Sequence, residues 1–332
     1  MSALVLTGAT GFLGGAVLEI LESENRLREV IVLSRRAVPA LANRGVDVRV
    51  GSLADVAWLK ATVPAGSSIV HMAGRVGFDG EDPRGLYDLH VETTRTLARV
   101  ALDAGCHRFV VISSSGASAI SRHPHLHTEQ DRYPVQIVAR WPYYQSKMMQ
   151  ERLVLDLCRR EGLPGIVLAP SLLLGPGDHG GSSTDVISDF IARRLSFIPS
   201  GGISIVDVRD VAAAVVAALS LGRTGERYLL GSLNCRFSTF FDIVESCTGV
   251  AAPSLPAPRV AAVIGARLLE RFAPGQRASA ISPAKADMAS HFWYVDWSKA
   301  ARELGFAPRR PEETIRDTAA FLTAMPVAAH AG

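Results

Sequence analysis

Short apolar runs alternate with segments of helical periodicity between residue 4 and residue 112. Runs typical of strands occupy residues 4–7, 30–33, 46–50, 68–72 and 109–112. Apolar residues at helical spacing follow the first run, and a longer helical segment, residues 85–104, ends at Gly105. A run without polar positions, such as residues 30–33, indicates a strand buried on both faces, as in parallel sheets. The pattern therefore predicts an α/β fold with a doubly wound, mainly parallel sheet and right-handed crossovers.

The first apolar run leads into three glycines that are spaced three apart, Gly8, Gly11 and Gly14. We expect Gly8 to make the turn, Gly11 to let a diphosphate approach the backbone, and Gly14 to let the helix pack on the strand. The N–H groups and positive end of that helix would then face the anion. Because the spacing is G-x-x-G-x-x-G and not G-x-G-x-x-G, the alternative of a plain structural turn stays open beside the dinucleotide site.

Composition restricts the class of protein. The chain has 332 residues, of which 48% are hydrophobic and 20% charged, so a large domain with a smaller one is expected. A net charge of +3, from scattered lysines and arginines, argues against a nucleic-acid partner. No apolar run reaches the roughly 18 residues of a spanning helix, and no secretory leader begins the chain. The four cysteines lack metal or redox spacing and suggest buried thiols. We therefore expect a soluble, cytoplasmic protein.

Two arginines, Arg35 and Arg36, directly follow the second apolar run. At this strand end of a dinucleotide-binding unit, an acidic residue binds the adenosine ribose, whereas an arginine holds a 2′-phosphate. No acidic residue is present here, and a guanidinium pairs with phosphate in a fork geometry. The sequence thus predicts NADP(H), with NAD(H) possible if both arginines are only solvated. The small residues Ala73 and Gly74 after the fourth run would let the cofactor lie across the sheet edge.

Histidines occur in two places that invite a chemical interpretation. His71 lies in the apolar run 68–72, and we interpret it as a hydrogen-bonded core side chain and not as a proton carrier. His123, His125 and His127 alternate in a loop, but no nearby residue completes a metal-ligand set. We therefore predict no metal site and leave the role of this loop open.

A tyrosine and a lysine, Tyr143 and Lys147, open a segment expected to be helical to about residue 161. Four residues apart, they share one helical face. A free phenol has a pKa near 10, too high for efficient proton transfer at neutral pH, but a nearby ammonium favours the phenolate and lowers this pKa. A tyrosine and a lysine at this spacing often occur by chance. They are a stronger indication of a catalytic pair here, because a glycine turn and the serines at positions 113–115 precede them.

Taken in order, the motifs resemble those of the extended short-chain dehydrogenase/reductase superfamily, which includes nucleotide-sugar epimerases, 3β-hydroxysteroid dehydrogenases and dihydroflavonol reductases. They are T-G-A-T-G-F-L-G at 7–14, H-M-A-G at 71–74, V-V-I-S-S-S at 110–115 and Y-Y-Q-S-K at 143–147. Further similar segments are residues 165–170, 174–178, 205–212 and 297–308. The resemblance covers nearly the whole chain and implies a Rossmann fold and an NAD(P)-dependent oxidoreductase.

The resemblance implies a role for each matching position. Tyr143 would transfer a proton to or from the substrate oxygen, while Lys147 holds the nicotinamide ribose and lowers the pKa of the phenol. Ser115 would hydrogen-bond the reacting oxygen, with Ser113 nearer the cofactor. The other implied cofactor contacts are Thr7 at the first turn, Gly8, Gly11, Phe12, Leu13 and Gly14 at the diphosphate, Ser52 and Leu53 at the adenine, and Pro170 at the nicotinamide.

The departures from the family pattern concern the substrate as well as the cofactor. Ser52 stands where an aspartate is usual, His90 where an asparagine often joins the proton path, and Ala169 where an arginine is common. The Thr-Asp-Glu run of sugar-nucleotide dehydratases and the V-Y-G of epimerases are both missing after Ser115. These differences favour a less polar ketone or alcohol over a sugar nucleotide.

The C-terminal part is expected to form a smaller, mostly helical substrate domain. We assign residues 1–174 to the dinucleotide-binding domain, to which 205–244 return, and 175–332 to the substrate domain, mainly 175–204 and 245–332. Residues 259–272 are expected to form a helix that lines the cleft, although a peripheral membrane contact is possible. The aromatic residues 292–294 are expected mainly in the core. Ser298 is the expected N-cap of one late helix, and Pro311 belongs in the first turn of the last.

Together these features predict an NADP(H)-dependent reductase or dehydrogenase that interconverts a ketone and a secondary alcohol. The substrate would be apolar, for example steroid-like, isoprenoid or polyketide-like. The alternative is an epimerase or dehydratase with a tightly held cofactor, and a third hypothesis is a protein that keeps the fold without catalysis. The chain would act as a monomer or homodimer; the substrate and the direction of reaction are left open.

Overall fold

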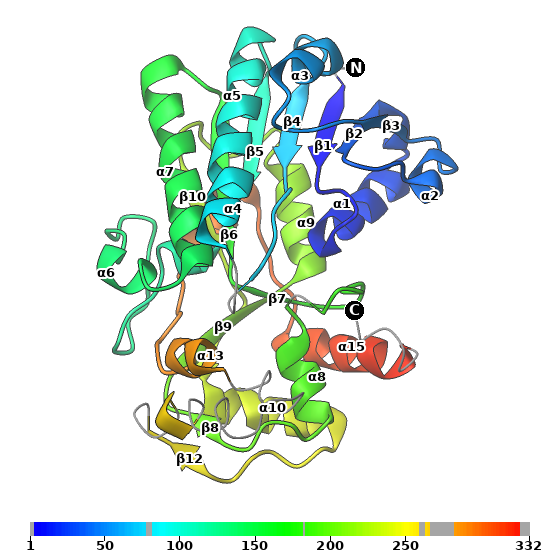
Figure 1. Ribbon diagram of the computed structural model, residues 1–332. Coiled ribbons are helices and arrows are strands. Elements are labelled where there is room, and N and C mark those ends of the chain that lie inside the picture. Colours follow the sequence, from blue (N-terminus) through cyan, green and yellow to red (C-terminus); the bar gives the residue numbers. More distant parts are fainter. Residues whose placement is uncertain (1–2, 78–81, 182, 259–262, 266–281, 326–332) are drawn as a thin grey trace.

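A seven-stranded, entirely parallel sheet forms the centre of the protein, with the strand order β10-β6-β5-β4-β1-β2-β3. The computed structural model describes residues 3–77, 82–181, 183–258, 263–265 and 282–325 (Figure 1). The strands are β1 (Leu4–Thr7), β2 (Val30–Ser34), β3 (Asp47–Val50), β4 (Ser68–His71), β5 (Arg108–Ile112), β6 (Gly165–Pro170) and β10 (Arg227–Leu230). The α/β class and the parallel Rossmann sheet predicted from the sequence are confirmed.

Helices cover both faces of this sheet, because successive strand residues are apolar and point to opposite sides. Leu4 and Leu6 of β1 belong to one hydrophobic core, whereas Val5 between them belongs to the other. The first core lies under α1 (Phe12–Ser23) and α9 (Val208–Ala217), which pack on each other. The second lies under α3 (Val56–Thr62), α5 (Thr93–Asp103) and α7 (Pro142–Glu161); Figure 1 shows α5 and α7 side by side.

The long helix expected at residues 85–104 is present but is not uniform. It consists of α4 (Pro83–Tyr87), a π-helical turn (Asp88–Glu92) and α5. A π turn widens a helix locally and is often found at functional sites. Here it brings the buried His90 toward α7, against which the turn packs.

A second, smaller region lies at the end of the sheet to which β1 and β4 point (Figure 1). It contains a three-stranded sheet in the order β11-β9-β7 and a pair of two-residue strands, β12-β8. The strands are β7 (Leu172–Leu174), β8 (Ile198–Pro199), β9 (Gly202–Asp207), β11 (Leu233–Arg236) and β12 (Pro256–Ala257). The helices of this region are α8 (Asp185–Ile191), α10 (Phe237–Thr248), α13 (Pro283–Met288) and α15 (Pro311–Ala324). The late helix α14 (Ser298–Leu304) instead packs on β10 and belongs to the first core of the large sheet.

This second region has a core of its own, built from β7, β9, α8, α10 and α15. Residues 205–244 were expected to belong to the dinucleotide-binding domain. Within this segment, β10 lies in the large sheet and α9 packs on α1, whereas β9 and β11 lie in the small sheet, so this domain assignment stays a prediction. Pro311 is the first residue of α15, as expected. Trp297, not Ser298, occupies the N-cap of α14, because the helix begins one residue earlier than expected. The expected helix at 259–272 lies outside the described residues except for 263–265.

Within the described ranges, no helix has both the length and the apolar character that crossing a bilayer requires.

Candidate active site

The glycine turn after β1 lies directly beside the end of β4. Gly8 has a φ of +72°, and a Cβ at this position would come within 2.6 Å of the backbone of Met72 and Ala73. A side chain at this position would therefore meet both conformational strain and a backbone collision. β1 and β4 are neighbours in the sheet, so the turn and the Ala73–Gly74 segment share one edge, as the sequence predicted.

The first helix begins with free N–H groups at this turn. Gly11 is the N-cap of α1 without any side-chain hydrogen bond, and the first turn contains no acidic residue. A Cβ on Gly14 would lie 2.3 Å from the carbonyl oxygen of Gly8, so only glycine lets the helix pack this closely. Because the N–H groups of Phe12, Leu13 and Gly14 lack helical partners, this end of α1 is suited to an anion such as a diphosphate.

Thr7 and His71 join the two strands below the turn. The Thr7 hydroxyl lies 2.7 Å from His71 Nδ1 and accepts a hydrogen bond from the Ala73 N–H at 3.2 Å. Burial lowers the pKa of His71 to about 3, so the ring is neutral at physiological pH. The structure confirms His71 as a hydrogen-bonded core histidine, and it shows that the Thr7 side chain holds the sheet edge together.

Tyr143 lies in the first turn of α7, which packs on the short turn Ser115–Ala117 after β5. Burial raises the pKa of the phenol to about 12, and a hydrogen bond with the Ser114 side chain acts in the opposite direction. Sequence reasoning did not single out Ser114, the middle serine of the triplet. Ser115 is buried beside this turn, and its hydroxyl makes no hydrogen bond within the described chain.

Lys147 is buried one helical turn after Tyr143. Its ammonium donates hydrogen bonds to the carbonyl oxygen of Ile112 and to Oε1 of Gln150, both at 3.0 Å. Desolvation lowers the pKa of this ammonium to about 8. The expected lowering of the Tyr143 pKa by Lys147 is not produced by the protein alone, since burial of the phenol outweighs the single favourable hydrogen bond from Ser114.

Ser113, the first serine of the triplet, is directed at a buried ion pair. It donates to Glu151 at 2.8 Å, and Glu151 also accepts from Arg227 at 2.6 Å and from the Tyr133 hydroxyl at 2.8 Å. Both charged side chains are almost completely buried. Ser113 therefore links the end of β5 to α7, and its proposed contact with a cofactor stays a prediction.

The remaining predicted cofactor positions lie at the ends of other strands. Arg35 and Arg36 follow β2 and are exposed, and the described part of the chain supplies no carboxylate to either guanidinium. Ser52 and Leu53 follow β3, where the exposed Ser52 hydroxyl accepts from the Ala54 N–H. Pro170 is the last, buried residue of β6 and pairs with Leu230 of β10. These locations are compatible with a dinucleotide along the carboxyl edge of the sheet.

His90, whose role the sequence left open, fastens the first turn of α7. Its Nε2 accepts the Arg75 N–H at 3.2 Å, so Nδ1 carries the proton and donates to the Ser146 hydroxyl at 2.8 Å. Ser146 in turn donates to the Tyr143 carbonyl oxygen at 2.7 Å. The His90 ring also meets the Tyr143 ring edge-on, with centroids 5.8 Å apart. Burial lowers the pKa of His90 to about 2, so this ring is neutral as well.

The histidine loop contains a third polar group that the sequence analysis did not find. Asp131 Oδ2 lies 3.0 Å from His125 Nε2 and 2.9 Å from His127 Nδ1, so the expectation that nothing nearby completes a ligand set is wrong. The same oxygen accepts the Thr128 N–H. The backbone of His127 pairs with residues 294–296. As observed, the group is a hydrogen-bonded turn that fastens this loop.

Aromatic side chains extend from Tyr143 to the second region. The Tyr144 ring lies 5.0 Å, centroid to centroid, from both Tyr143 and Trp293, and Trp141 packs 5.8 Å from Trp293. A Cβ on Gly116 would lie only 2.2 Å from the Tyr144 ring, so the turn after the serines is covered by this aromatic cluster. The half-buried Trp293 was expected mainly as a core residue, and it packs against a small core cluster that contains Trp141 and Met148.

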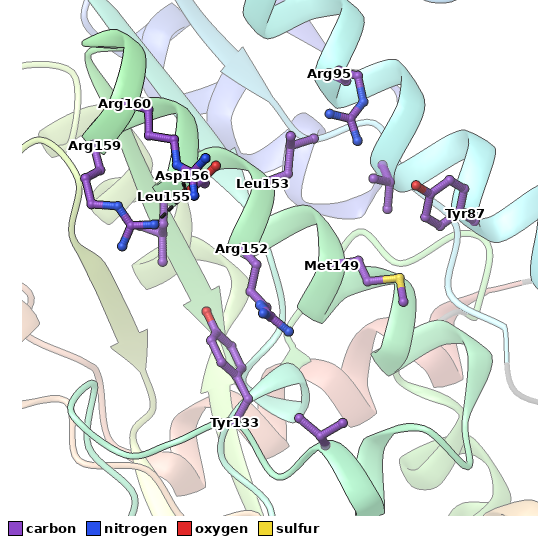
Figure 2. A pocket seen from close by; sticks show the side chains of 12 residues that line it. Tyr87, Arg95, Tyr133, Met149, Arg152, Leu153, Leu155, Asp156, Arg159 and Arg160 are labelled. Carbon is purple, nitrogen blue, oxygen red and sulfur yellow. Dashed lines mark hydrogen bonds and ion pairs between the residues drawn. The ribbon is translucent and has the colours of Figure 1, made fainter.

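A groove of about 910 Å³ lies on the opposite face of α7 (Figure 2). Residues of α7 and of the long helix before it line this groove, together with Tyr133 and Val135. Its charged lining residues are Arg95, Arg152, Asp156, Arg159 and Arg160. None of the predicted catalytic or cofactor-binding residues lines it, so it is separate from the site at the sheet edge.

Comparisons with known proteins found a matching family model, similar sequences and similar solved structures. The model of the NAD dependent epimerase/dehydratase family matches residues 4–231. Sterol demethylase protein B of Methylococcus capsulatus (strain ATCC 33009 / NCIMB 11132 / Bath) is 28% identical over 327 residues, 97% of this chain and 98% of that protein. The 3 beta-hydroxysteroid dehydrogenase type 7 of Homo sapiens is 30% identical over 202 residues, 58% of this chain and 54% of that protein. The crystal structure of gox2253 superposes with a TM-score of 0.82 at 27% identity and covers 97% of this chain and 98% of its own.

Proposed function

The chain belongs to the NAD dependent epimerase/dehydratase family, and we propose that it is an NADP(H)-dependent reductase or dehydrogenase acting on an apolar ketone/secondary alcohol pair. Membership makes it an NAD(P)-dependent oxidoreductase of the extended short-chain dehydrogenase/reductase superfamily. The cofactor preference, the substrate class and the residue roles are the parts that we propose.

The observation that carries the proposal is that α7 places Tyr143 against Ser114, just after β5, and Lys147 against the Ile112 carbonyl at the end of β5. A bound nicotinamide supplies or accepts the hydride. Tyr143 gives its phenolic proton to the carbonyl oxygen in reduction and takes it back in oxidation. Ser115 hydrogen-bonds the same oxygen, and Lys147 contributes a positive charge next to the cofactor ribose.

The pKa of Tyr143 supports a proton donor. With the pKa raised to about 12, the phenol is protonated at neutral pH, which is the form that reduction of a ketone needs. Oxidation needs the phenolate, so it gains from rising pH. The proposed enzyme therefore favours reduction near neutral pH, and oxidation gains from rising pH only until Lys147, whose pKa is about 8, loses its charge.

Two features support an apolar substrate. The Tyr144 ring packs beside Tyr143, and Trp293 packs on Tyr144, so apolar rings adjoin the proposed proton donor. Relatives over most or half of the chain are named for sterols and steroids. The alternative, an epimerase or dehydratase, is supported by the family name, but this chain has neither the Thr-Asp-Glu run of dehydratases nor the V-Y-G of epimerases at residues 115–119.

The choice of cofactor is tested at β2. Replacing both Arg35 and Arg36 by alanine should weaken NADPH binding about 10- to 100-fold, the value of one or two charge-assisted hydrogen bonds. NADH binding should change little, because NADH has no 2′-phosphate. Fluorescence titration with both reduced cofactors measures this, with Arg28→Ala, exposed just before β2, as the matched control. Equal losses for NADPH and NADH would reject the assignment.

The reaction itself is tested by incubating the protein with NADPH and a set of steroid, isoprenoid and polyketide-like ketones. Stoichiometric oxidation of NADPH with formation of the alcohol is the expected result. Isomerisation of a nucleotide sugar without net consumption of cofactor would instead identify an epimerase and overturn the proposal.

A further inference from the structure

Lys147 is the end of a series of hydrogen bonds that runs through Gln150 and Thr94 to His71. The donor and the acceptor of each bond can be assigned. Thr94 is the central member, because its hydroxyl donates to the carbonyl oxygen of His90. A hydroxyl has one proton, so the Thr94 oxygen can only accept from its two other partners. These partners are His71 Nε2 at 2.9 Å and the Gln150 side-chain amide at 2.7 Å.

This assignment fixes the orientation of the Gln150 amide. Nε2 must face Thr94, because only this end of the amide can donate. Oε1 then faces Lys147 and accepts one ammonium proton at 3.0 Å, while the Ile112 carbonyl accepts another at the same distance. An ammonium has three protons, so the described residues accept two of them and leave one for a bound ligand.

We propose that Gln150 is a positioning residue that holds the Lys147 ammonium in place for the reaction. Gln150, Thr94 and Lys147 are all buried, so water does not compete for these hydrogen bonds. The inference rests on the proposed function and extends it by one residue. Gln150 touches neither substrate nor cofactor in this proposal; it acts through Lys147.

The charged and titratable groups around this ammonium come from three elements. His71 of β4 and His90 of the π-helical turn are both neutral at physiological pH. On α7, Tyr143 is protonated, and Glu151 favours the charged ammonium but is paired with Arg227. The neutral amide of Gln150 and the Ile112 carbonyl are therefore the direct acceptors of Lys147 within the described chain.

The proposal is tested by titrating Lys147 directly. The chain has four lysines, Lys60, Lys147, Lys285 and Lys299, so protein carrying ¹³C-labelled lysine gives few side-chain NMR signals, and Lys147→Arg identifies the relevant one. Gln150→Leu removes an acceptor from the charged form and should lower the Lys147 pKa by about one unit. Gln150→Glu places a carboxylate beside the ammonium and should raise this pKa. Shifts of opposite sign are not expected from a merely structural residue.

Two further variants keep the test informative if the leucine variant does not fold. Gln150→Asn retains an amide but is one methylene group too short to reach both partners, so it should behave like Gln150→Leu. Thr94→Val removes the group that orients the amide and should shift the pKa of Lys147 in the same direction by less. Gln136→Leu, on the exposed face of α6 (Val135–Val138), is the matched control and should leave this pKa unchanged. An unchanged Lys147 pKa in folded Gln150→Asn would overturn the proposal.

Turnover gives the second readout. In Gln150→Leu the alkaline limb of the kcat profile for alcohol oxidation should move to lower pH by about one unit, together with the pKa of Lys147. An alkaline limb that stays in place while the NMR titration moves would contradict the positioning role. The two proposals can fail independently. A wild-type protein that is inactive on ketones would refute the proposed function. The NMR titration needs no substrate and tests the hydrogen bond between Gln150 and Lys147 in either case.

Discussion

The two faces of α7 handle polar groups in opposite ways. On the inner face, Lys147, Gln150 and Glu151 are buried, and each has hydrogen-bonding partners that come from other elements of the fold. On the outer face, Asp156 pairs with two neighbouring arginines of the same helix, beside a groove (Figure 2). The inner face is a network with fixed geometry, whereas the outer face is a set of charges in contact with solvent.

This difference shows where the chemistry can reside. A buried polar group costs free energy unless its partners are in place, so the inner network specifies one arrangement of the ammonium and the phenol. Exposed ion pairs contribute little and are screened by salt. The groove lies on the outer face, whereas the groups positioned for proton transfer lie on the inner face.

The largest effect on stability is expected from breaking the buried pair on the inner face. Glu151→Leu leaves Arg227, Tyr133 and Ser113 without their acceptor and should lower the free energy of unfolding by about 3–5 kcal/mol. The matched change on the outer face, Asp156→Leu, should cost less than about 1 kcal/mol. Urea unfolding followed by circular dichroism compares the two, and equal costs would remove the distinction between the faces.

A double variant shows that the cost arises from the unpaired charge. Glu151→Leu combined with Arg227→Met should recover much of the lost stability, since a buried ion pair can often be replaced by apolar side chains. No recovery in the double variant would indicate that packing, not charge, causes the loss.

A smaller effect on stability is expected at two adjacent glycines of α1. Gly14 is tightly packed, whereas Gly15 faces open space. Gly14→Ala would force a Cβ to within 2.3 Å of the Gly8 carbonyl oxygen, so the turn must move; we expect a loss of about 1–3 kcal/mol and weaker cofactor binding. Gly15 faces open space, and Gly15→Ala should stabilise α1 by about 0.5–1 kcal/mol. Unfolding curves and NADPH titration test both; tight NADPH binding by a stable Gly14→Ala protein would count against the diphosphate site.

The sequence pattern was enough to predict those structural features that depend on residues close together in the chain. The strand runs, the Gly8 turn, the helix that starts at Pro142 and the core position of His71 all follow from periodicity or from short spacings. The π-helical turn was missed, because it does not change the apolar pattern of residues 85–104.

The contacts that sequence reasoning missed join residues far apart in the chain. The Gln150–Thr94 bond spans 56 positions, and the Arg227–Glu151 pair spans 76. Ser114 could have been found from the triplet, but which serine meets Tyr143 depends on the turn that follows β5. Asp131 lies only four residues from His127, yet the loop conformation alone brings it to both histidines.

The central claim, that Tyr143 on the inner face of α7 handles the proton in an NADP(H)-dependent reduction, is tested most directly by measuring turnover and cofactor affinity in one variant. Tyr143→Phe keeps the ring and its packing but has no proton to give. We predict NADPH affinity close to that of the wild type and kcat lower by about 10²- to 10⁴-fold. A kcat within a few-fold of the wild type, with NADPH still bound, would contradict the account.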